Sequence, residues 1–132
     1  MIGAIIGDIV GSRFEFGAAP QQGFELFTPD CSYTDDTICT IAIADAVLNE
    51  RDYQESLLDW CRRYPDPMGG YGRRFYQWIN ADNPQPTDSF GNGSAMRVSP
   101  IGWLFDEWEE VIEEAKKSAI VSHNHPEGIK GA

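Results

Sequence analysis

The hydrophobic residues of this chain recur mainly every three or four positions, and no segment shows the sustained period-two alternation of half-buried strands. This spacing indicates amphipathic helices, separated by polar segments that contain glycine and proline. We therefore predict an all-α fold, a compact orthogonal multi-helix bundle with long loops that converge on one end. The expected helices cover residues 1–16, 37–49, 53–64, 73–80, 94–105 and a segment from residue 106, and another first turn begins at residue 127.

Capping residues and prolines predict where these helices begin and end. Asp52 resembles the first residue of a capping box, and the helix that it opens should stop before Pro65. Pro100 should kink or break the helix predicted over residues 94–105. Asp106 is expected to cap the next helix, whose inner stripe would be Trp108, Val111, Ile112, Ala115 and Ala119.

Glycine recurs every four residues on the first predicted helix, at Gly3, Gly7 and Gly11. Each interior glycine costs a helix about 1 kcal/mol relative to alanine, so this stripe predicts close approach of another helix or a ligand. The loop over residues 17–33 should fold back over the protein through three anchors, Phe24, Leu26 and Phe27.

The helix predicted over residues 73–80 follows a glycine-rich turn. Its inner side would carry three apolar residues, and its outer side two arginines, Arg73 and Arg74. The polar loop after it, residues 81–93, is long for a segment without regular structure, which is typical of a functional loop.

The composition is that of an acidic, core-forming protein of 132 residues, with 42% hydrophobic residues and a formal net charge of −11. This length fits one domain. The charge argues against a nucleic-acid partner and would attract divalent cations. Three cysteines without metal-site spacing indicate reduced thiols and a cytoplasmic location. We expect no signal peptide and no membrane partner, because there is no basic leader and no segment long enough to span a bilayer.

The segment Thr34-Asp35-Asp36 places a hydroxyl and two adjacent carboxylates immediately before an apolar helical run. Hard oxygen ligands of this kind suit Mg²⁺, Mn²⁺ or Ca²⁺ and do not suit zinc. Alternatively, Thr34 or Asp35 is an ordinary N-cap and Asp36 a solvated first-turn acid, and the three residues alone favour this second interpretation.

The second candidate segment is Phe90-Gly91-Asn92-Gly93-Ser94-Ala95-Met96-Arg97. Its glycines would let a ligand approach the backbone, and a glycine loop that leads into a helix can bind an anion. An ordinary tight turn at Asn92-Gly93 would explain the same residues. Arg97 would either reach a phosphate or pair with one of the many acids.

Three further side chains are candidates for chemistry. Glu15 lies where the first helix should end, and it is either a general acid or base or simply a surface acid. His123 and His125 flank Asn124 in a stretch that is not convincingly a strand, with no cysteine nearby. We therefore favour hydrogen bonding to a ligand or to the backbone over zinc ligation for these histidines.

Together and in this order, four segments resemble the ADP-ribosylglycohydrolase family, which includes dinitrogenase reductase-activating glycohydrolase and the ADP-ribosyl-acceptor hydrolases. The resemblance covers nearly the whole chain. The segments are Gly7-Asp8-x-x-Gly11-Ser12-x-x-Glu15, Tyr33-Thr34-Asp35-Asp36-Thr37, Gly91-Asn92-Gly93-Ser94-Ala95-Met96-Arg97 and Ser122-His123-Asn124-His125-Pro126.

The resemblance implies a compact all-α fold with a binuclear Mg²⁺ (or Mn²⁺) site in a cleft. It also implies hydrolysis of the glycosidic bond between ADP-ribose and a protein side chain or small acceptor. The metal ligands would be Thr34, Asp35 and Asp36, and the catalytic residues Glu15, Asp35 and Asp36. The substrate-binding residues would be Gly70, Tyr71, Gly72, Asn92, Gly93, Ser94, Met96 and His123.

The chain departs from the family pattern in its acidic residues. The family completes its metal site with a second cluster of the Asp-x-Asp-Ser/Thr kind far downstream, whereas Glu127 is the only acid here after Glu114. We therefore expect residues 1–132 to be a single, incomplete domain, the N-terminal half of a larger all-α domain. Its exposed apolar surface would favour self-association or complementation by a C-terminal half.

Three functional hypotheses stay open from the sequence. The first is a hydrolase that is active as a longer chain and acts on an ADP-ribosylated protein or a small ADP-ribosyl substrate. The second is a non-catalytic module that binds ADP-ribose or another anion. The third is a truncated product without function that associates through its exposed core.

Overall fold

The computed structural model describes all 132 residues and confirms an all-α fold. Two isolated bridges, Thr34–Met68 and Thr87–His123, are the only strand-like pairings. None of the helices is both long enough and apolar enough to cross a membrane. The elements are α1 (Ile2–Gly11), η1 (Ser12–Phe14), α2 (Asp35–Leu48), α3 (Tyr53–Arg63), α4 (Arg73–Ile79), α5 (Ile101–Leu104), α6 (Trp108–Ile120) and α7 (Pro126–Gly131).

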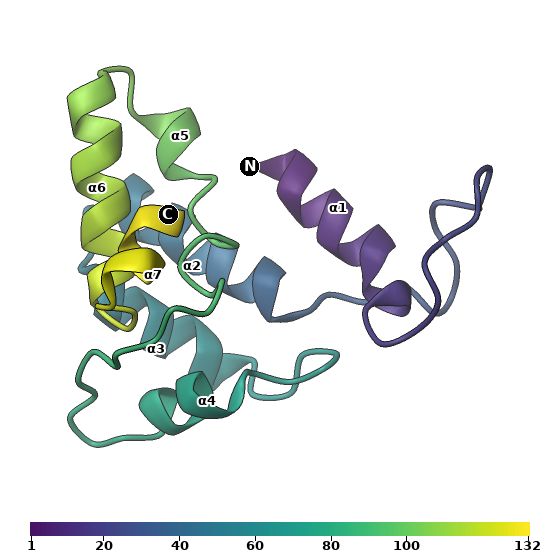
Figure 1. Cartoon of the computed structure of the whole chain (residues 1–132), viewed down its shortest axis with the longest axis horizontal. Coiled ribbons are helices and arrows are strands. Elements are labelled where there is room, and N and C mark those ends of the chain that lie inside the picture. The colour runs from purple at the N-terminus through teal and green to yellow at the C-terminus, as the bar shows by residue number, and fades with distance from the viewer.

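Helix α2 lies at the centre of the bundle, with α3 and α4 on one side and α5, α6 and α7 on another (Figure 1). It is buried almost all round, because eight of its 14 residues are buried. Helices α2 to α6 all contribute to one core, which consists of Ile38, Cys39, Ala42, Ile43, Leu57, Cys61, Trp78, Ile79, Ile101 and Ala115.

Side-chain caps set the starts of the two central helices, and α2 begins two residues before the predicted residue 37. Thr34 is the N-cap of α2, and its hydroxyl accepts a hydrogen bond from the Asp36 N–H at 3.2 Å. Asp52 caps α3 in the same way by accepting from the Glu55 N–H at 3.0 Å, and α3 ends before Pro65. These caps connect residues two or three positions apart, which explains why the sequence predicts them.

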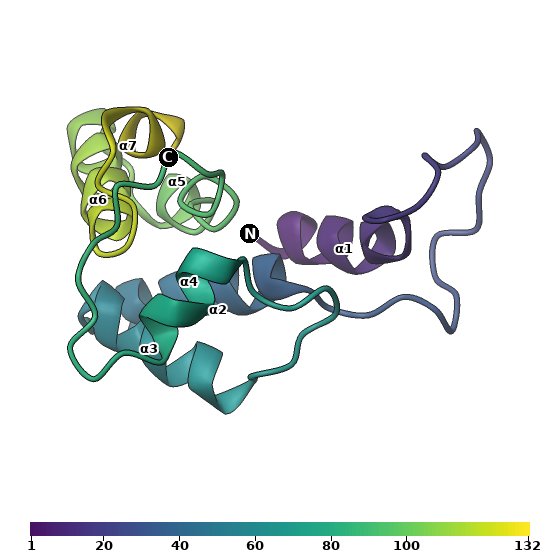
Figure 2. The same ribbon diagram turned by 60° about the horizontal axis from the view of Figure 1, so that its bottom comes forward.

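Helix α1 extends away from the rest of the bundle and meets it near the start of α2 (Figures 1 and 2). Within α1 only Val10 is buried, and Ile2 is 68% exposed. The glycine stripe does not contact another helix in this chain, because a Cβ on Gly3, Gly7 or Gly11 would meet nothing within 4 Å.

The carboxylate of Asp8 fixes α1 to α2. It accepts hydrogen bonds from the Thr34 N–H at 3.0 Å, the Thr34 hydroxyl at 2.6 Å and the Thr37 hydroxyl at 2.5 Å. Asp8 therefore holds the α1 helix against the first turn of α2, where the two candidate carboxylates Asp35 and Asp36 lie.

The helix predicted over residues 94–105 is wrong, because only Ile101–Leu104 is helical and the residues before it form successive turns. Pro100 disfavours a helical conformation at the residue before it and lacks an N–H to continue a helix. Ser94 and Arg97 bond instead to distant segments of the chain, which fixes an irregular backbone.

Two predictions about the surface are also wrong. Helix α6 begins after Glu107 and has no side-chain cap from Asp106. Its predicted inner stripe is only partly buried: Trp108 is 71% and Ile112 52% exposed, since no segment of this chain covers that side. In the loop over residues 17–33, Leu26 and Phe27 are both 58% exposed and do not anchor it. That loop is held instead by the Arg13 guanidinium, which donates to the Glu25 carbonyl and the Thr28 hydroxyl.

Candidate functional site

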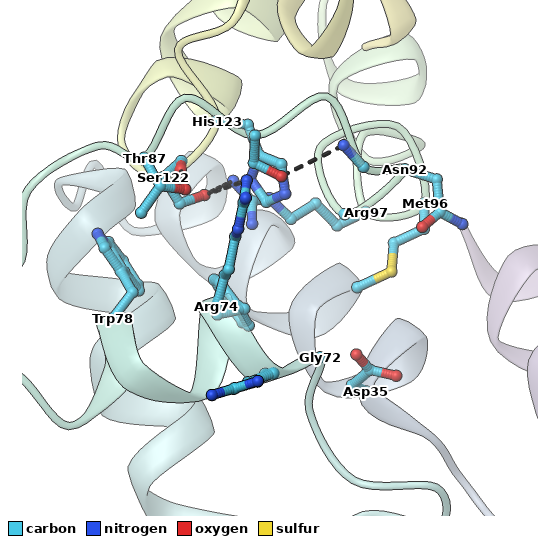
Figure 3. A pocket seen from close by; sticks show the side chains of 15 residues that line it. Asp35, Gly72, Arg74, Trp78, Thr87, Asn92, Met96, Arg97, Ser122 and His123 are labelled. Carbon is cyan, nitrogen blue, oxygen red and sulfur yellow. Dashed lines mark hydrogen bonds between the residues drawn. The ribbon is translucent and has the colours of Figure 1, made fainter.

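A pocket of about 400 Å³ opens between α4, the loop that precedes Ser94 and the turn at Ser122–His123, and it reaches the start of α2 (Figure 3). Four segments that are far apart in sequence therefore meet at one cavity. The lining residues are Asp35, Gly72, Arg73, Arg74, Phe75, Trp78, Thr87, Ser89, Gly91, Asn92, Gly93, Met96, Arg97, Ser122 and His123.

The structure brings five of the eight predicted substrate-binding residues to this pocket, namely Gly72, Asn92, Gly93, Met96 and His123. The other three, Gly70, Tyr71 and Ser94, do not line it, and their role in binding stays a prediction. Tyr71 donates its hydroxyl to the Tyr64 carbonyl at 2.7 Å, and Ser94 donates to the Gly128 carbonyl at 2.6 Å. In this structure those two side chains hold neighbouring segments together.

Arg97 is fully buried at the edge of the pocket, although it was expected to be within reach of an acid or a phosphate. Its Nη2 donates to the Ser118 carbonyl and to the Ser122 hydroxyl, each at 2.8 Å, and it pairs with no acid. The Nε and Nη1 atoms have no hydrogen-bond partner in the protein. A buried cation with unsatisfied donors is costly, so an acceptor from a ligand or water would be favourable there.

His123 lies beside Arg97 and forms a hydrogen bond through Nδ1 to the Ser122 hydroxyl at 2.9 Å. Burial and, next, the positive charge of Arg97 lower the pKa of His123 to about 4. The imidazole is therefore neutral near pH 7. His125 serves the backbone, since its Nδ1 accepts from the Glu127 N–H at 3.1 Å as the cap of α7.

Gly93 contacts His123 so closely that a side chain would not fit without movement. A Cβ built on Gly93 would lie 2.8 Å from Nε2 and 2.9 Å from Cε1 of His123. The glycine thus allows the loop backbone to approach the imidazole, whereas a Cβ on Gly72, across the same pocket, would meet nothing within 4 Å.

An acidic cluster adjoins the pocket at Asp35. Burial, then the charge of Asp36 and also those of Glu15 and Asp8, raise the pKa of Asp35 to about 6. Burial and the charges of Asp8 and Glu15 likewise raise the pKa of Asp36. The four carboxylates are therefore close enough to repel one another, and two of them, Glu15 and Asp8, come from the α1–η1 segment.

The donors of this cluster fit a hard divalent cation in kind. The Asp35 and Asp36 carboxylates and the Thr34 hydroxyl are oxygen ligands, and Thr34 retains a free lone pair after donating to Asp8 and accepting from Asp36. No group of three or more His, Cys, Asp or Glu side chains in the chain is arranged to hold a metal ion. The protein ligands present would thus form only part of a coordination shell.

Sequence reasoning did not assign a role to Asp8 or to the two pocket arginines. Asp8 is part of the first family-like segment, and that signal could have identified it. Arg73 and Arg74 were correctly predicted to face away from the core. Helical spacing, however, does not distinguish a side chain that faces open solvent from one that lines a cavity.

Known proteins of similar sequence belong to one family. The family model for ADP-ribosylglycohydrolase matches residues 1–132. The chain is 29% identical to ADP-ribosylhydrolase ARH3 of Mus musculus and 27% identical to those of Xenopus tropicalis and Homo sapiens. Each match covers 100% of this chain and 45–46% of the relative, so the chain spans about half the length of the curated relatives it matches.

A solved structure described as an ADP-ribosylglycohydrolase-related protein complex superposes with a TM-score of 0.67 at 22% sequence identity, over 98% of this chain and 49% of that one. This likeness supports the fold. Because the family model matches the whole sequence, the chain belongs to the ADP-ribosylglycohydrolase family.

Proposed function

We propose that this chain supplies the ligand pocket and several carboxylates of a metal-dependent hydrolase that releases ADP-ribose from a protein side chain or small acceptor. One observation carries the proposal: the pocket, which three arginines line, and the acidic cluster share a single residue, Asp35. A ligand with an anionic diphosphate, and with a ribose whose glycosidic bond is to be hydrolysed, matches the arginine-lined pocket and the acidic cluster.

Asp35, Asp36 and Thr34 would hold Mg²⁺, with Mn²⁺ as the alternative, because they offer the hard oxygen atoms that these cations prefer. When bound, the metal supplies an activated water and orients the ribose hydroxyls. Burial and then the charges of Asp36, Glu15 and Asp8 raise the pKa of Asp35, and a cation beside these carboxylates would offset their repulsion.

The residues of the chain have separate tasks in this proposal. The backbone of Gly91, Asn92 and Gly93 borders the pocket where the diphosphate would lie, and neutral His123 offers Nε2 to a ribose hydroxyl. Glu15 would act as general acid or base at the glycosidic bond. The neighbouring carboxylates would stabilise the positive charge that develops on the sugar ring in an oxocarbenium-like transition state.

A turnover assay tests the proposal. Incubation of the hydrolase to which this chain contributes with an ADP-ribosylated peptide and Mg²⁺ should release ADP-ribose, and both chelation of the metal and the Asp35→Ala/Asp36→Ala double substitution should abolish the release. The matched control is Glu109→Gln, an exposed acid on α6 that is remote from the pocket. Binding of ADP-ribose without any release would support a non-catalytic binding module instead.

A further inference from the structure

The charges that line the pocket are opposite to those of the chain as a whole. The chain has 21 acidic and 10 basic residues, yet the pocket is lined by three arginines, Arg73, Arg74 and Arg97, and by one acid, Asp35. Cationic groups concentrated in one cavity of an acidic protein indicate that the cavity takes an anion.

Arg73 and Arg74 differ from every other arginine of the chain because they make no hydrogen bond or ion pair with it. The remaining five all donate to carboxylates, hydroxyls or backbone carbonyls: Arg13, Arg51, Arg62, Arg63 and Arg97. An exposed arginine without a partner is common on protein surfaces. Two adjacent ones that both line the same cavity are less easily explained as solvated surface residues.

The direction of Arg74 is consistent with a contact to ligand. Its side chain extends from α4 toward Ser122 and His123, across the pocket from Asn92 (Figure 3). On that far side the Nε and Nη1 of Arg97 lack partners and the side chain is fully buried. Cationic side chains thus border the cavity from two segments, the helix α4 and the turns that contain Arg97.

We propose that Arg73 and Arg74 bind the diphosphate of the ligand from the α4 side, and that they set the preference of the pocket for phosphorylated over unphosphorylated nucleosides. The two guanidinium groups match the two negative charges of a diphosphate diester, and arginine binds phosphate through paired N–H groups. This inference rests on the proposed function for the identity of the ligand, although the binding test below does not require turnover.

Calorimetry of the full chain with ADP, inorganic pyrophosphate and adenosine tests the proposal. The Arg73→Gln/Arg74→Gln variant should raise the Kd for ADP by roughly 10- to 100-fold and change the Kd for adenosine by less than about twofold. The Arg73→Lys/Arg74→Lys variant, which keeps the charge, should recover part of the affinity for ADP. Both arginines are exposed, so the thermal midpoint should stay unchanged.

The matched control is Lys116→Gln/Lys130→Gln, which removes the same net charge at two exposed lysines that form no ion pair and do not line the pocket. If this control weakens ADP binding as much as the arginine variant, the effect is one of overall charge and the proposal is wrong. It is also wrong if the wild-type chain binds neither ADP nor pyrophosphate, or if the arginine variant keeps the preference for ADP over adenosine.

The two proposals fail in different ways. Arginine-dependent ADP binding without release of ADP-ribose from any modified peptide would overturn the proposed hydrolase and leave the role of the arginines intact. Release of ADP-ribose with an unchanged KM in the Arg73→Gln/Arg74→Gln variant would overturn the role of the arginines and leave the proposed hydrolase intact.

Discussion

The acidic cluster and the arginine-lined pocket are adjacent but are built in contrasting ways. Asp35 and Asp36 lie in the first turn of the most deeply buried helix, where burial and the charges of neighbouring carboxylates raise the pKa of each. Arg73 and Arg74 lie on a short helix and line a cavity, and neither forms a hydrogen bond or ion pair within the chain. One region concentrates negative charge and the other positive charge, which matches the proposed ligand, because its diphosphate would face the arginines and its ribose the carboxylates.

The largest expected effect comes from removing the charge at the junction of the two regions. Asp35→Asn should lower ADP-ribose release by on the order of 1000-fold, because a proposed metal ligand is lost. The same change should raise the free energy of unfolding at pH 7 by about 1 kcal/mol, since burial and the neighbouring charges both disfavour the ionised carboxyl in the folded state. Enzyme assays and chemical denaturation measure the two effects, and a loss of stability together with a loss of activity would contradict this account.

The next largest effect concerns the close approach of the loop to the imidazole. Gly93→Ala should weaken ADP-ribose binding by roughly tenfold. The new methyl would lie 2.8 Å from Nε2 of His123, so either the imidazole or the loop would have to move. Calorimetry measures the change. Gly102→Ala is the control, since a Cβ there meets nothing within 4 Å and Gly102 does not line the pocket, and an equal loss in both variants would remove the basis for the prediction.

Asp8 connects the exposed helix to the acidic cluster, so its removal should affect α1 more than the core. Asp8→Ala should lower the free energy of unfolding by about 2 kcal/mol, because the Thr34 and Thr37 hydroxyls and the Thr34 N–H lose an ionised acceptor. Hydrogen exchange should show lost protection in α1 and retained protection in α3. The exposed Asp30→Ala serves as control, and full protection of α1 in Asp8→Ala would contradict the prediction.

The smallest effect is a dependence on pH. The folded pKa of His123, about 4, lies below its ordinary value of 6.5, so the unfolded state binds more protons between these values. The stability due to neutral His123 is therefore present above pH 6.5 and is lost as pH falls toward 4. The contribution of Asp35 to stability changes with pH in the opposite direction. Its raised pKa favours the folded state at low pH, so this contribution is lost as pH rises from 3.8 to about 6.

Denaturation at pH 7 and pH 5 separates these two contributions. The wild-type chain should lose more unfolding free energy between pH 7 and pH 5 than His123→Asn, which does not titrate in this range. An identical loss in both chains would show that His123 is not held in its neutral form by the fold.

Features that depend on near neighbours in sequence could be predicted, whereas features that depend on distant segments could not. The caps at Thr34 and Asp52 involve residues two or three positions away, and both were predicted. Arg97 is buried by bonds to residues 21 and 25 positions away, and the chain there is not the helix that its spacing indicated. Trp108 is exposed for a similar reason, because whether another segment packs on it does not depend on its neighbours in sequence.

The same distinction applies to the site. Gly72, Asn92, Gly93, Met96 and His123 were predicted from the family resemblance and meet at one pocket. The charge of that pocket could not be predicted, because the sequence shows that Arg73 and Arg74 face outward but not that α4 and the loop before Ser94 enclose a cavity there.

The measurement that tests the central claim most directly is the affinity of the chain for ADP-ribose with and without Mg²⁺, in the wild type and in Asp35→Ala/Asp36→Ala. If the acidic cluster and the pocket form one site, Mg²⁺ should strengthen ADP-ribose binding in the wild type, and ADP-ribose should strengthen Mg²⁺ binding by the same factor. Neither effect should remain in the double variant. Equal affinities for ADP-ribose in all four conditions would contradict the claim that the two regions act together.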